Sequence, residues 1–446
     1  MVLDFYTRHA ISACMSEFTP RPVPERALSR NLHLGRVAGG VLGSTLGSAL
    51  GQMLRGNRPD LAAAALNPAN AVRVAGGLAH LRGAAMKLGQ MLSMESGAIL
   101  PPEVTAILGQ LQASAPAMPP AQLKTMLTRE WGAGWQAQFQ RFEVRPVAAA
   151  SIGQVHRAVL RDGQVLAIKV QFPGVAASID SDIATLGRLM RLPGVVPKDL
   201  DLTPLLAEAR AQLHEEADYL REAQALGAAC DAHPGFVVPR VHQPLCTPHV
   251  LAMEYIESAP IEALLEHPQA VRDRAVADLI TLVLREIFAL GQMQTDPNFA
   301  NFRLAPDGRI VLLDFGATRD IAPEISQRYR LLLRALLAED RSGIWDQMAA
   351  LGYFSPTQPE ARQALIRDLA LQASAPLRMD TPYDFGRSTL IADLAVAGEA
   401  LGRAREFWHV PPAELLFLHR KIGGIFLLAQ RLQAQIALKP LVARWA

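Results

Sequence analysis

Short runs of alternating apolar and polar residues lie between positions 135 and 171, and this alternation predicts β-strands. Two runs, QFQRFEV and QVHRAVL, follow this pattern in part, and a third strand is predicted from the mainly apolar run VLAIKVQ. Asp162-Gly163 lies between the last two runs and is typical of a tight hairpin turn. A fourth strand is predicted over 250–255, VLAMEY. These patterns predict a small sheet with a loop, RPVAAAS, between its first two strands.

Other parts of the chain have the pattern of helices. Residues 71–112 predict helices that break at Ser96-Gly97 and restart at Pro101-Pro102-Glu103, where proline followed by an acidic residue suits a helix start. One long helix is predicted from about Thr203 to Cys230. With 446 residues, the chain is expected to form two or three structural units.

A glycine-spaced segment lies near the N-terminus, with glycine at every fourth position from Gly35 to Gly51. On a helix these glycines share one side, where a second helix can approach closely. The uncharged run from Val37 to Leu54 would be about 27 Å long as a helix, close to the thickness of a bilayer's hydrocarbon core. Two interpretations stay open: a soluble helix packed tightly on the protein, or a helix that docks on or spans a membrane and self-associates.

Composition changes this picture little. Half of the residues are apolar, 19% are charged and the net charge is +2, which fits a globular protein and does not predict nucleic-acid binding. The three cysteines are widely spaced and suggest neither a disulfide framework nor a zinc site. Lysine is rare, with only six in the chain, so each lysine is a candidate for a position that needs a compact ammonium group.

The strongest chemical signal is the spacing of three polar residues between 294 and 316. Asp296 is followed by Asn301 and then by Asp314, which opens an Asp-Phe-Gly triplet. This is the spacing of the catalytic-loop Asp, the Asn and the magnesium-binding Asp of protein kinases. Two short strands, 301–304 and 310–313, are predicted to form a hairpin that brings Asn301 and Asp314 together. The residues before Asp296 are Gln-Thr, where kinases have His-Arg, so protein phosphorylation is not the favoured activity.

The predicted sheet carries the nucleotide-binding candidates. Lys169 lies in Ala-Ile-Lys, the third-strand lysine pattern in which the ammonium contacts the α- and β-phosphates. The loop over the phosphates is rich in alanine instead of glycine, which predicts a stiffer loop. Adenine is expected near Glu254, where the last strand leads into the hinge. The loop candidates are Ala148, Ala149, Ala150 and Ser151.

The long predicted helix offers several acidic partners for Lys169. Glu215, Glu216, Asp218 and Glu222 lie close together, and spacing alone does not decide which of them pairs with the lysine. Further upstream, Lys87 and Gln90 share one helix face, which by pattern alone predicts a solvated surface.

Six motifs occur together in this chain: KLGQ at 87–90, AAASIGQVH at 148–156, AIK at 167–169, EADYLREA at 216–223, QTDPNFAN at 294–301 and LLDFGATR at 312–319. Together they closely resemble the UbiB family of atypical kinase-like proteins, over about residues 75–435. QTDPNFANF and FLHRKIGGIFLLAQRL at 417–432 resemble the coenzyme-Q-biosynthesis branch of that family.

The resemblance implies an α+β, bilobal protein-kinase-like fold whose helical N-terminal extension, with its KxGQ motif, covers the active site. It also implies that Lys169 pairs with Glu222, that Asn301 and Asp314 hold Mg²⁺, and that Asp296 takes the catalytic position. The same resemblance brings Lys87 and Gln90 into the active site, anchored by Glu216 and Asp218.

The resulting hypothesis is a magnesium-dependent ATPase or small-molecule kinase that supports ubiquinone biosynthesis at a membrane. The alternatives are a scaffold that binds nucleotide and lipid, and a protein kinase. ATP or ADP and Mg²⁺ are the expected cofactors. The expected partners are membrane lipids, a ubiquinone precursor, coenzyme Q biosynthesis proteins and a second copy bound through Gly35–Gly51, with no nucleic acid. The expected location is the cytoplasmic side of a bacterial-type membrane, with peripheral attachment or a single marginal span.

The hypothesis divides the chain into five segments. The expected segments are an irregular lead-in over 1–34, a glycine-spaced helix over 35–60, a helical extension over 71–130, an N-lobe over 131–257 and a C-lobe over 258–446.

Overall fold

The structure is a computed structural model that describes residues 117–150, 152–190, 203–354, 358–403 and 412–446. The chain forms two units. Unit 1 comprises Met1–Ala223 and Val241–Tyr255, and unit 2 comprises Gln224–Arg240 and Ile256–Ala446. Lys87, Gln90, Ser151 and the glycine-spaced segment lie outside the described residues, and the five predicted segments stay a prediction.

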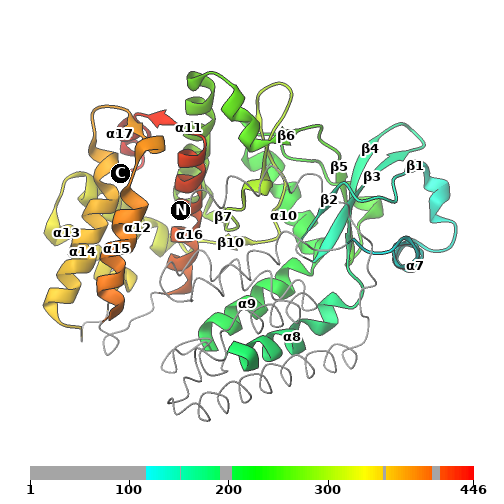
Figure 1. The fold of residues 1–446 in the computed structure, drawn as a ribbon, viewed down its shortest axis with the longest axis horizontal. Helices are drawn as coiled ribbons and strands as arrows, with labels where there is room; N and C mark the ends of the chain where they lie inside the picture. The colour runs from blue at the N-terminus through cyan, green and yellow to red at the C-terminus, as the bar shows by residue number, and fades with distance from the viewer. Residues whose placement is uncertain (1–116, 151, 191–202, 355–357, 404–411) are drawn as a thin grey trace, which may run out of the picture. The chain divides into compact units, whose positions relative to one another are not determined.

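Unit 1 contains an antiparallel sheet in the order β1-β3-β4-β5, with β2 also paired to β3 (Figure 1). The predicted strands are confirmed, and the predicted turn is present because Gly163 has a φ of 89° and donates its N–H to Leu160. Buried and half-buried residues alternate along β3 from Gln154 to Leu160, whereas nearly all of β4 is buried. The bounds are β1 Phe139–Phe142, β2 Ala148–Ala149, β3 Gly153–Leu160, β4 Val165–Gln171 and β5 Val250–Glu254.

The loop predicted between the first two strands is partly a strand. Ala148 pairs with Val155 and Ala149 pairs with Gln154, so these alanines form β2 on the same edge of β3 that β1 occupies. The prediction missed β2 because strand pairing depends on which backbone groups meet, and two alanines give no alternating pattern. Next to β2, the Ala150 N–H donates to the carbonyl oxygen of Gly153 at 2.9 Å.

The single long helix predicted from Thr203 to Cys230 is wrong. The structure has two helices, α9 over Thr203–Glu216 and α10 over Tyr219–Ala232. Asp218 ends the first and starts the second, because its carboxylate accepts hydrogen bonds from the backbone N–H groups of Leu220 and Arg221 as an N-cap does. The unit boundary falls inside α10, after Ala223. Two further helices of unit 1 are α7 over Pro120–Trp131 and α8 over Val175–Met190.

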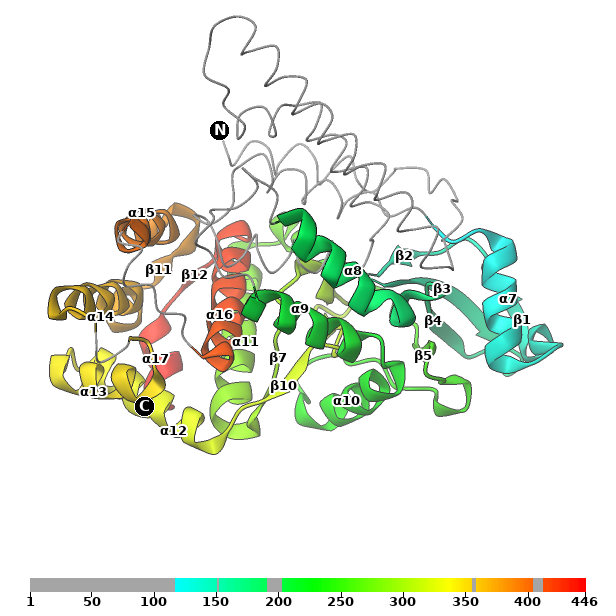
Figure 2. The same ribbon diagram turned by 90° about the horizontal axis from the view of Figure 1, so that it is seen from below.

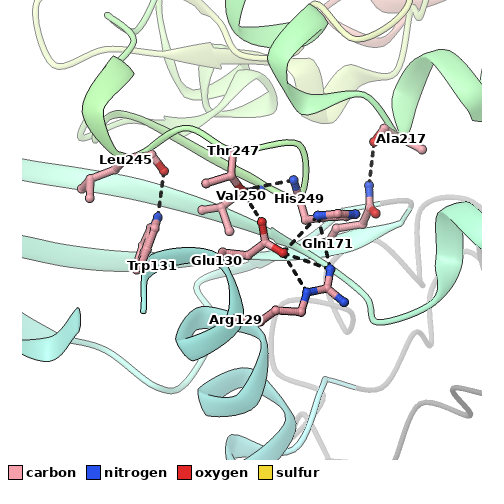
Figure 3. Close-up of polar contacts among 9 residues, drawn as sticks. All are labelled: Arg129, Glu130, Trp131, Gln171, Ala217, Leu245, Thr247, His249 and Val250. Carbon is pink, nitrogen blue, oxygen red and sulfur yellow. Dashed lines mark hydrogen bonds and ion pairs between the residues drawn. The ribbon is translucent and has the colours of Figure 1, made fainter. Parts of the chain in front are cut away.

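Helix α7 is held beside β5 by polar contacts of its last turn (Figure 3). Trp131 donates its indole N–H to Leu245, and Thr247 donates its hydroxyl to Glu130 at 2.8 Å. Burial alone would raise the pKa of Glu130, but the Thr247 hydroxyl, Arg129 and His249 together lower it. Glu130 therefore stays ionised while it joins α7 to the segment that leads into β5.

Unit 2 is mainly helical, and its described residues form three small antiparallel sheets. β8 pairs with β9 and β6, β7 pairs with β10, and β11 pairs with β12, so the predicted hairpin over 301–313 is confirmed. The strands are β6 Ala259–Pro260, β7 Gln292–Gln294, β8 Phe302–Leu304, β9 Ile310–Leu312, β10 Thr318–Asp320, β11 Tyr383–Asp384 and β12 Gln435–Ile436.

The helices of unit 2 surround a core in which α16 lies alongside α11 (Figure 2). A π-helical turn, Glu286–Leu290, continues α11. Among the residues that the structure describes, no helix combines the length and apolarity needed to cross a bilayer. The helices are α11 Gln269–Arg285, α12 Pro323–Leu337, α13 Arg341–Leu351, α14 Glu360–Ser374, α15 Leu390–Arg403, α16 Ala413–Arg431 and α17 Leu438–Ala443.

Gly153 gives a stability test of the turn at the start of β3. A Cβ at this position would lie 2.5 Å from the Val170 carbonyl oxygen and 2.7 Å from the Tyr219 hydroxyl oxygen. We expect Gly153→Ala to lower the free energy of unfolding by about 1–3 kcal/mol, as overpacking does. Gly227→Ala is the control, because a Cβ there meets nothing within 4 Å. Equal urea midpoints for the two variants would contradict the tight packing of this turn.

Candidate functional site

The central polar contact of unit 1 joins Lys169 on β4 to Glu222 on α10. The Lys169 ammonium donates to both carboxylate oxygens of Glu222, at 2.6 and 2.8 Å. The Glu222 side chain is 2% exposed and the Lys169 side chain is 11% exposed, so both charges are largely removed from water. The pairing expected from the resemblance is therefore present, and it selects Glu222 among the acids of this region.

Local structure explains why Glu222 reaches the lysine. Lys169 lies in the middle of the sheet, between Val155 of β3 and Leu251 of β5. Because Asp218 restarts the helix, Glu222 lies in the first turn of α10. The ring of Tyr219, which is fully buried, lies 5.0 Å from the Lys169 ammonium and adds a cation–π contact.

For the other nucleotide-binding candidates of unit 1, the structure gives a position, and the nucleotide-binding role stays a prediction. Ala148 and Ala149 are exposed on β2, and Ala150 is half-buried at the turn. Glu254 ends β5 opposite Leu166. Glu216 ends α9, and Asp218 caps α10; the partners predicted for both, Lys87 and Gln90, lie outside the described residues.

In unit 2, side chains hold the backbone at Asp296 from two sides. The carbonyl oxygen of Asp296 accepts from the Gln294 amide at 2.8 Å and from the Asn301 amide at 3.3 Å. Thr295 donates both its N–H and its hydroxyl to the carbonyl of Ala317, just after the Asp-Phe-Gly triplet. The loop that carries Asp296 and the segment after Asp314 are therefore tied together.

The hairpin brings the two predicted metal ligands to the same end of β8 and β9. Leu313 N–H donates to the carbonyl of Asn301 at 3.1 Å, so Asn301 lies beside the residue before Asp314. Asp314 accepts from the N–H of Gly316 at 2.9 Å through one carboxylate oxygen. Residues 315–322 are all that separates Asp314 from α12, so the described chain has no long activation segment.

These residues fit a magnesium site of the kinase type. The described residues contain no group of three or more His, Cys, Asp or Glu that could hold a metal by itself. Mg²⁺ in kinases needs only one or two protein oxygens, because phosphate oxygens and water complete its coordination. Asn301 and Asp314 offer oxygen ligands of that kind, and the hairpin holds them near each other.

A buried ion pair next to the loop that carries Asp296 was not predicted from the sequence. Lys421 on α16 lies 3.6 Å from Glu286 and donates to the Gln294 side-chain oxygen at 2.8 Å. Burial lowers the pKa of Lys421 and raises the pKa of Glu286, and the attraction between the charges offsets part of each change. Two sequence signals pointed to Lys421, namely the scarcity of lysine and its place in the motif FLHRKIGGIFLLAQRL.

The comparisons with known proteins agree with this geometry. The family model described as the ABC1 atypical kinase-like domain matches residues 110–348. Atypical kinase COQ8, mitochondrial, of Saccharomyces cerevisiae is 36% identical, over 93% of this chain and 83% of its own. Atypical kinase COQ8B, mitochondrial, of Rattus norvegicus is 34% identical, over 94% and 80%. The solved complex of Rv3197 with erythromycin from Mycobacterium tuberculosis has a TM-score of 0.57 and 28% identity, covering 82% of this chain and 93% of that one.

The fold and these matches define an atypical kinase-like protein, and a kinase-like domain implies ATP binding. The chain belongs to the ABC1, or UbiB, family, and its COQ8 relatives associate it with the coenzyme Q biosynthesis branch. The α+β kinase-like fold expected from the sequence is confirmed.

His233 gives unit 2 a pH-dependent stability. It stacks on Phe315 of the Asp-Phe-Gly triplet, with ring centres 6.4 Å apart. Burial, together with the charges of Arg285 and Lys421, lowers the pKa of His233 from 6.5 to about 4. Between pH 6.5 and about 4, His233 binds a proton in the unfolded chain but not in the folded chain. The free energy of unfolding therefore falls as the pH falls through this range.

We expect His233→Phe, which keeps an aromatic ring against Phe315, to reduce the loss of stability between pH 7 and pH 4.5 by on the order of 2 kcal/mol. The measurement is urea unfolding at both pH values. His267→Gln, at an exposed position of the same unit, is the control. Equal pH dependence in His233→Phe and the unmodified protein would contradict the assignment.

Proposed function

We propose that the protein is a magnesium-dependent ATPase or small-molecule kinase that supports ubiquinone biosynthesis at a membrane. The observation that carries the proposal is the hydrogen bond from Leu313 to Asn301, because it holds an amide and a carboxylate of the kinase type at one end of a hairpin. The Lys169–Glu222 pair supplies independent support from unit 1, since kinases use such a pair to hold the nucleotide phosphates.

Each residue has a defined task in this proposal. Lys169, oriented by Glu222, would donate to phosphate oxygens, and Asn301 and Asp314 would hold the metal ion. Bound Mg²⁺ would neutralise charge on the β- and γ-phosphates. Asp296 accepts a hydrogen bond from the attacking water or alcohol and orients it. The side-chain amides of Gln294 and Asn301 donate to the backbone carbonyl of Asp296 and keep this residue in position for that task.

A small acceptor or water suits this site better than a peptide. Protein kinases order an activation segment to bind peptide substrates, and residues 315–322 leave no room for a long one. Lys87 and Gln90, with Glu216 and Asp218, remain the proposed gate over the site. Ala148, Ala149, Ala150, Ser151 and Glu254 remain proposed nucleotide contacts.

We further propose peripheral attachment to a membrane through the glycine-spaced segment Gly35–Gly51, which also offers a surface for self-association. The COQ8 proteins named above are mitochondrial. For this chain, we propose contact with membrane lipids and name no cellular compartment. Ubiquinone precursors and the other biosynthetic proteins are the proposed partners.

The test measures phosphate release from MgATP with vesicles of phosphatidylcholine alone and with vesicles that also contain phosphatidylglycerol. We expect hydrolysis that rises with the anionic vesicles. We expect Asp314→Asn to lower turnover by about 100-fold or more and to remove most of the thermal shift caused by MgATP, because it removes charge from the metal site.

Asp320→Asn is the matched control, since Asp320 is an exposed acid of β10 only a few residues away. Normal MgATP binding and turnover in Asp314→Asn would contradict the metal assignment. A protein that binds MgATP but releases no phosphate with any vesicle would favour the nucleotide-binding scaffold instead.

A further inference from the structure

We propose that α16 positions the catalytic loop, through Arg420, Lys421 and Gly424, and that it does so in place of a phosphorylated activation segment. The inference rests on the proposed function, because it assigns positioning residues to Asp296 of the same site. Its evidence consists of three separate contacts made by one face of α16.

The first contact is an ion pair with Asp296 itself. The Arg420 guanidinium lies 3.5 Å from a carboxylate oxygen of Asp296, and the two side chains are 3% and 14% exposed. Two nitrogens of Arg420, Nε and Nη2, have no hydrogen-bond partner among the described residues. A buried guanidinium needs a compensating charge, and Asp296 is the acidic group that the described structure brings within ion-pair distance.

The second contact runs from Lys421 to the backbone of Asp296 through Gln294. Lys421 donates to the side-chain oxygen of Gln294, whose amide nitrogen donates to the carbonyl oxygen of Asp296. Glu286 completes the group, because its carboxylate lies 3.6 Å from Lys421 and accepts from the N–H of Gln294 at 3.3 Å. The same ammonium lies 5.5 Å from the ring of Phe302, next to Asn301. One lysine of α16 therefore touches both ends of the loop.

The third contact is steric. Gly424 is buried, and a Cβ at this position would lie 2.7 Å from Cγ of Pro297 and closer still to its Cβ. Pro297 follows Asp296 directly, and its ring is joined to the backbone, so it has no flexible end that could move aside. Gly424 lies four residues after Arg420 and three after Lys421, which are the spacings that bring helix residues to the same side.

These contacts explain how the loop functions without His-Arg before Asp296. In kinases that use an activation segment, phosphorylation orders it through new pairs with arginine. Here both cations come from α16 of the same chain and are present without a modification. Gln294, which seemed a departure from the kinase pattern, connects one of these cations to Asp296.

The test compares Gly424→Ala with Gly423→Ala. Both substitutions favour the helix equally by intrinsic propensity, but a Cβ at Gly423 meets nothing within 4 Å. We expect Gly424→Ala to lower kcat about 10- to 100-fold while the dissociation constant for MgATP changes less than about threefold, because Asp296 moves and the phosphate ligands do not. Gly423→Ala should keep the kcat of the unmodified protein.

Amide hydrogen exchange over residues 292–301 provides a readout that does not require activity. We expect about tenfold faster exchange in Gly424→Ala and no change in Gly423→Ala. Equal exchange and equal kcat in the two variants would overturn the inference. If the unmodified protein hydrolyses no ATP, the proposed function fails, and exchange alone still decides whether α16 holds the loop.

A second pair of variants covers the case in which Gly424→Ala does not fold. Arg420→Gln leaves Asp296 without its cation, whereas Arg431→Gln changes a half-buried arginine in the last turn of the same helix. We expect kcat to fall about tenfold or more in Arg420→Gln with KM nearly unchanged. A proportional loss of stability with no change in kcat would show a purely structural role and would overturn the inference.

Discussion

The burial of the Lys421 ammonium is the constraint on which the loop around Asp296 in unit 2 depends. Its side chain is 1% exposed, so removing its hydration is costly unless other groups replace the water. Glu286, the Gln294 amide and the Phe302 ring provide that replacement, and each belongs to a different element. The requirement to surround one charge therefore fixes the π-helical turn, β7 and β8 against α16.

The Lys169–Glu222 pair follows the same physical rule in unit 1. A buried lysine in β4 needs an acid, and α10 supplies it only because Asp218 restarts the helix immediately before. Buried ion pairs seldom add stability compared with apolar side chains of similar size. These two pairs are therefore better explained by positioning than by stability, because each lies next to residues to which we assign phosphate or acceptor chemistry.

Local patterns predicted much of the fold and part of the site. The strand over 165–171, its hairpin turn and the hairpin before Asp314 depend on short apolar runs and on turn residues, which the sequence shows directly. The break at Asp218 was missed because distant groups stabilise it: Pro248 accepts from Tyr219, and Gln171 donates to Ala217 (Figure 3). The roles of Gly424 and Lys421 were hidden for the same reason, since their partners lie more than a hundred residues earlier in the chain.

The most direct test of this account is a double-mutant cycle on Lys421→Met and Glu286→Leu, with the free energy of unfolding and kcat measured for all four proteins. We predict that each single variant loses about 3–5 kcal/mol, because it leaves one charge buried alone, and that the double variant recovers most of that loss. The double variant should nevertheless keep a kcat at least about tenfold below that of the unmodified protein, because Gln294 has lost its anchor. A double variant with full activity, or with the summed instability of both single variants, would contradict the account.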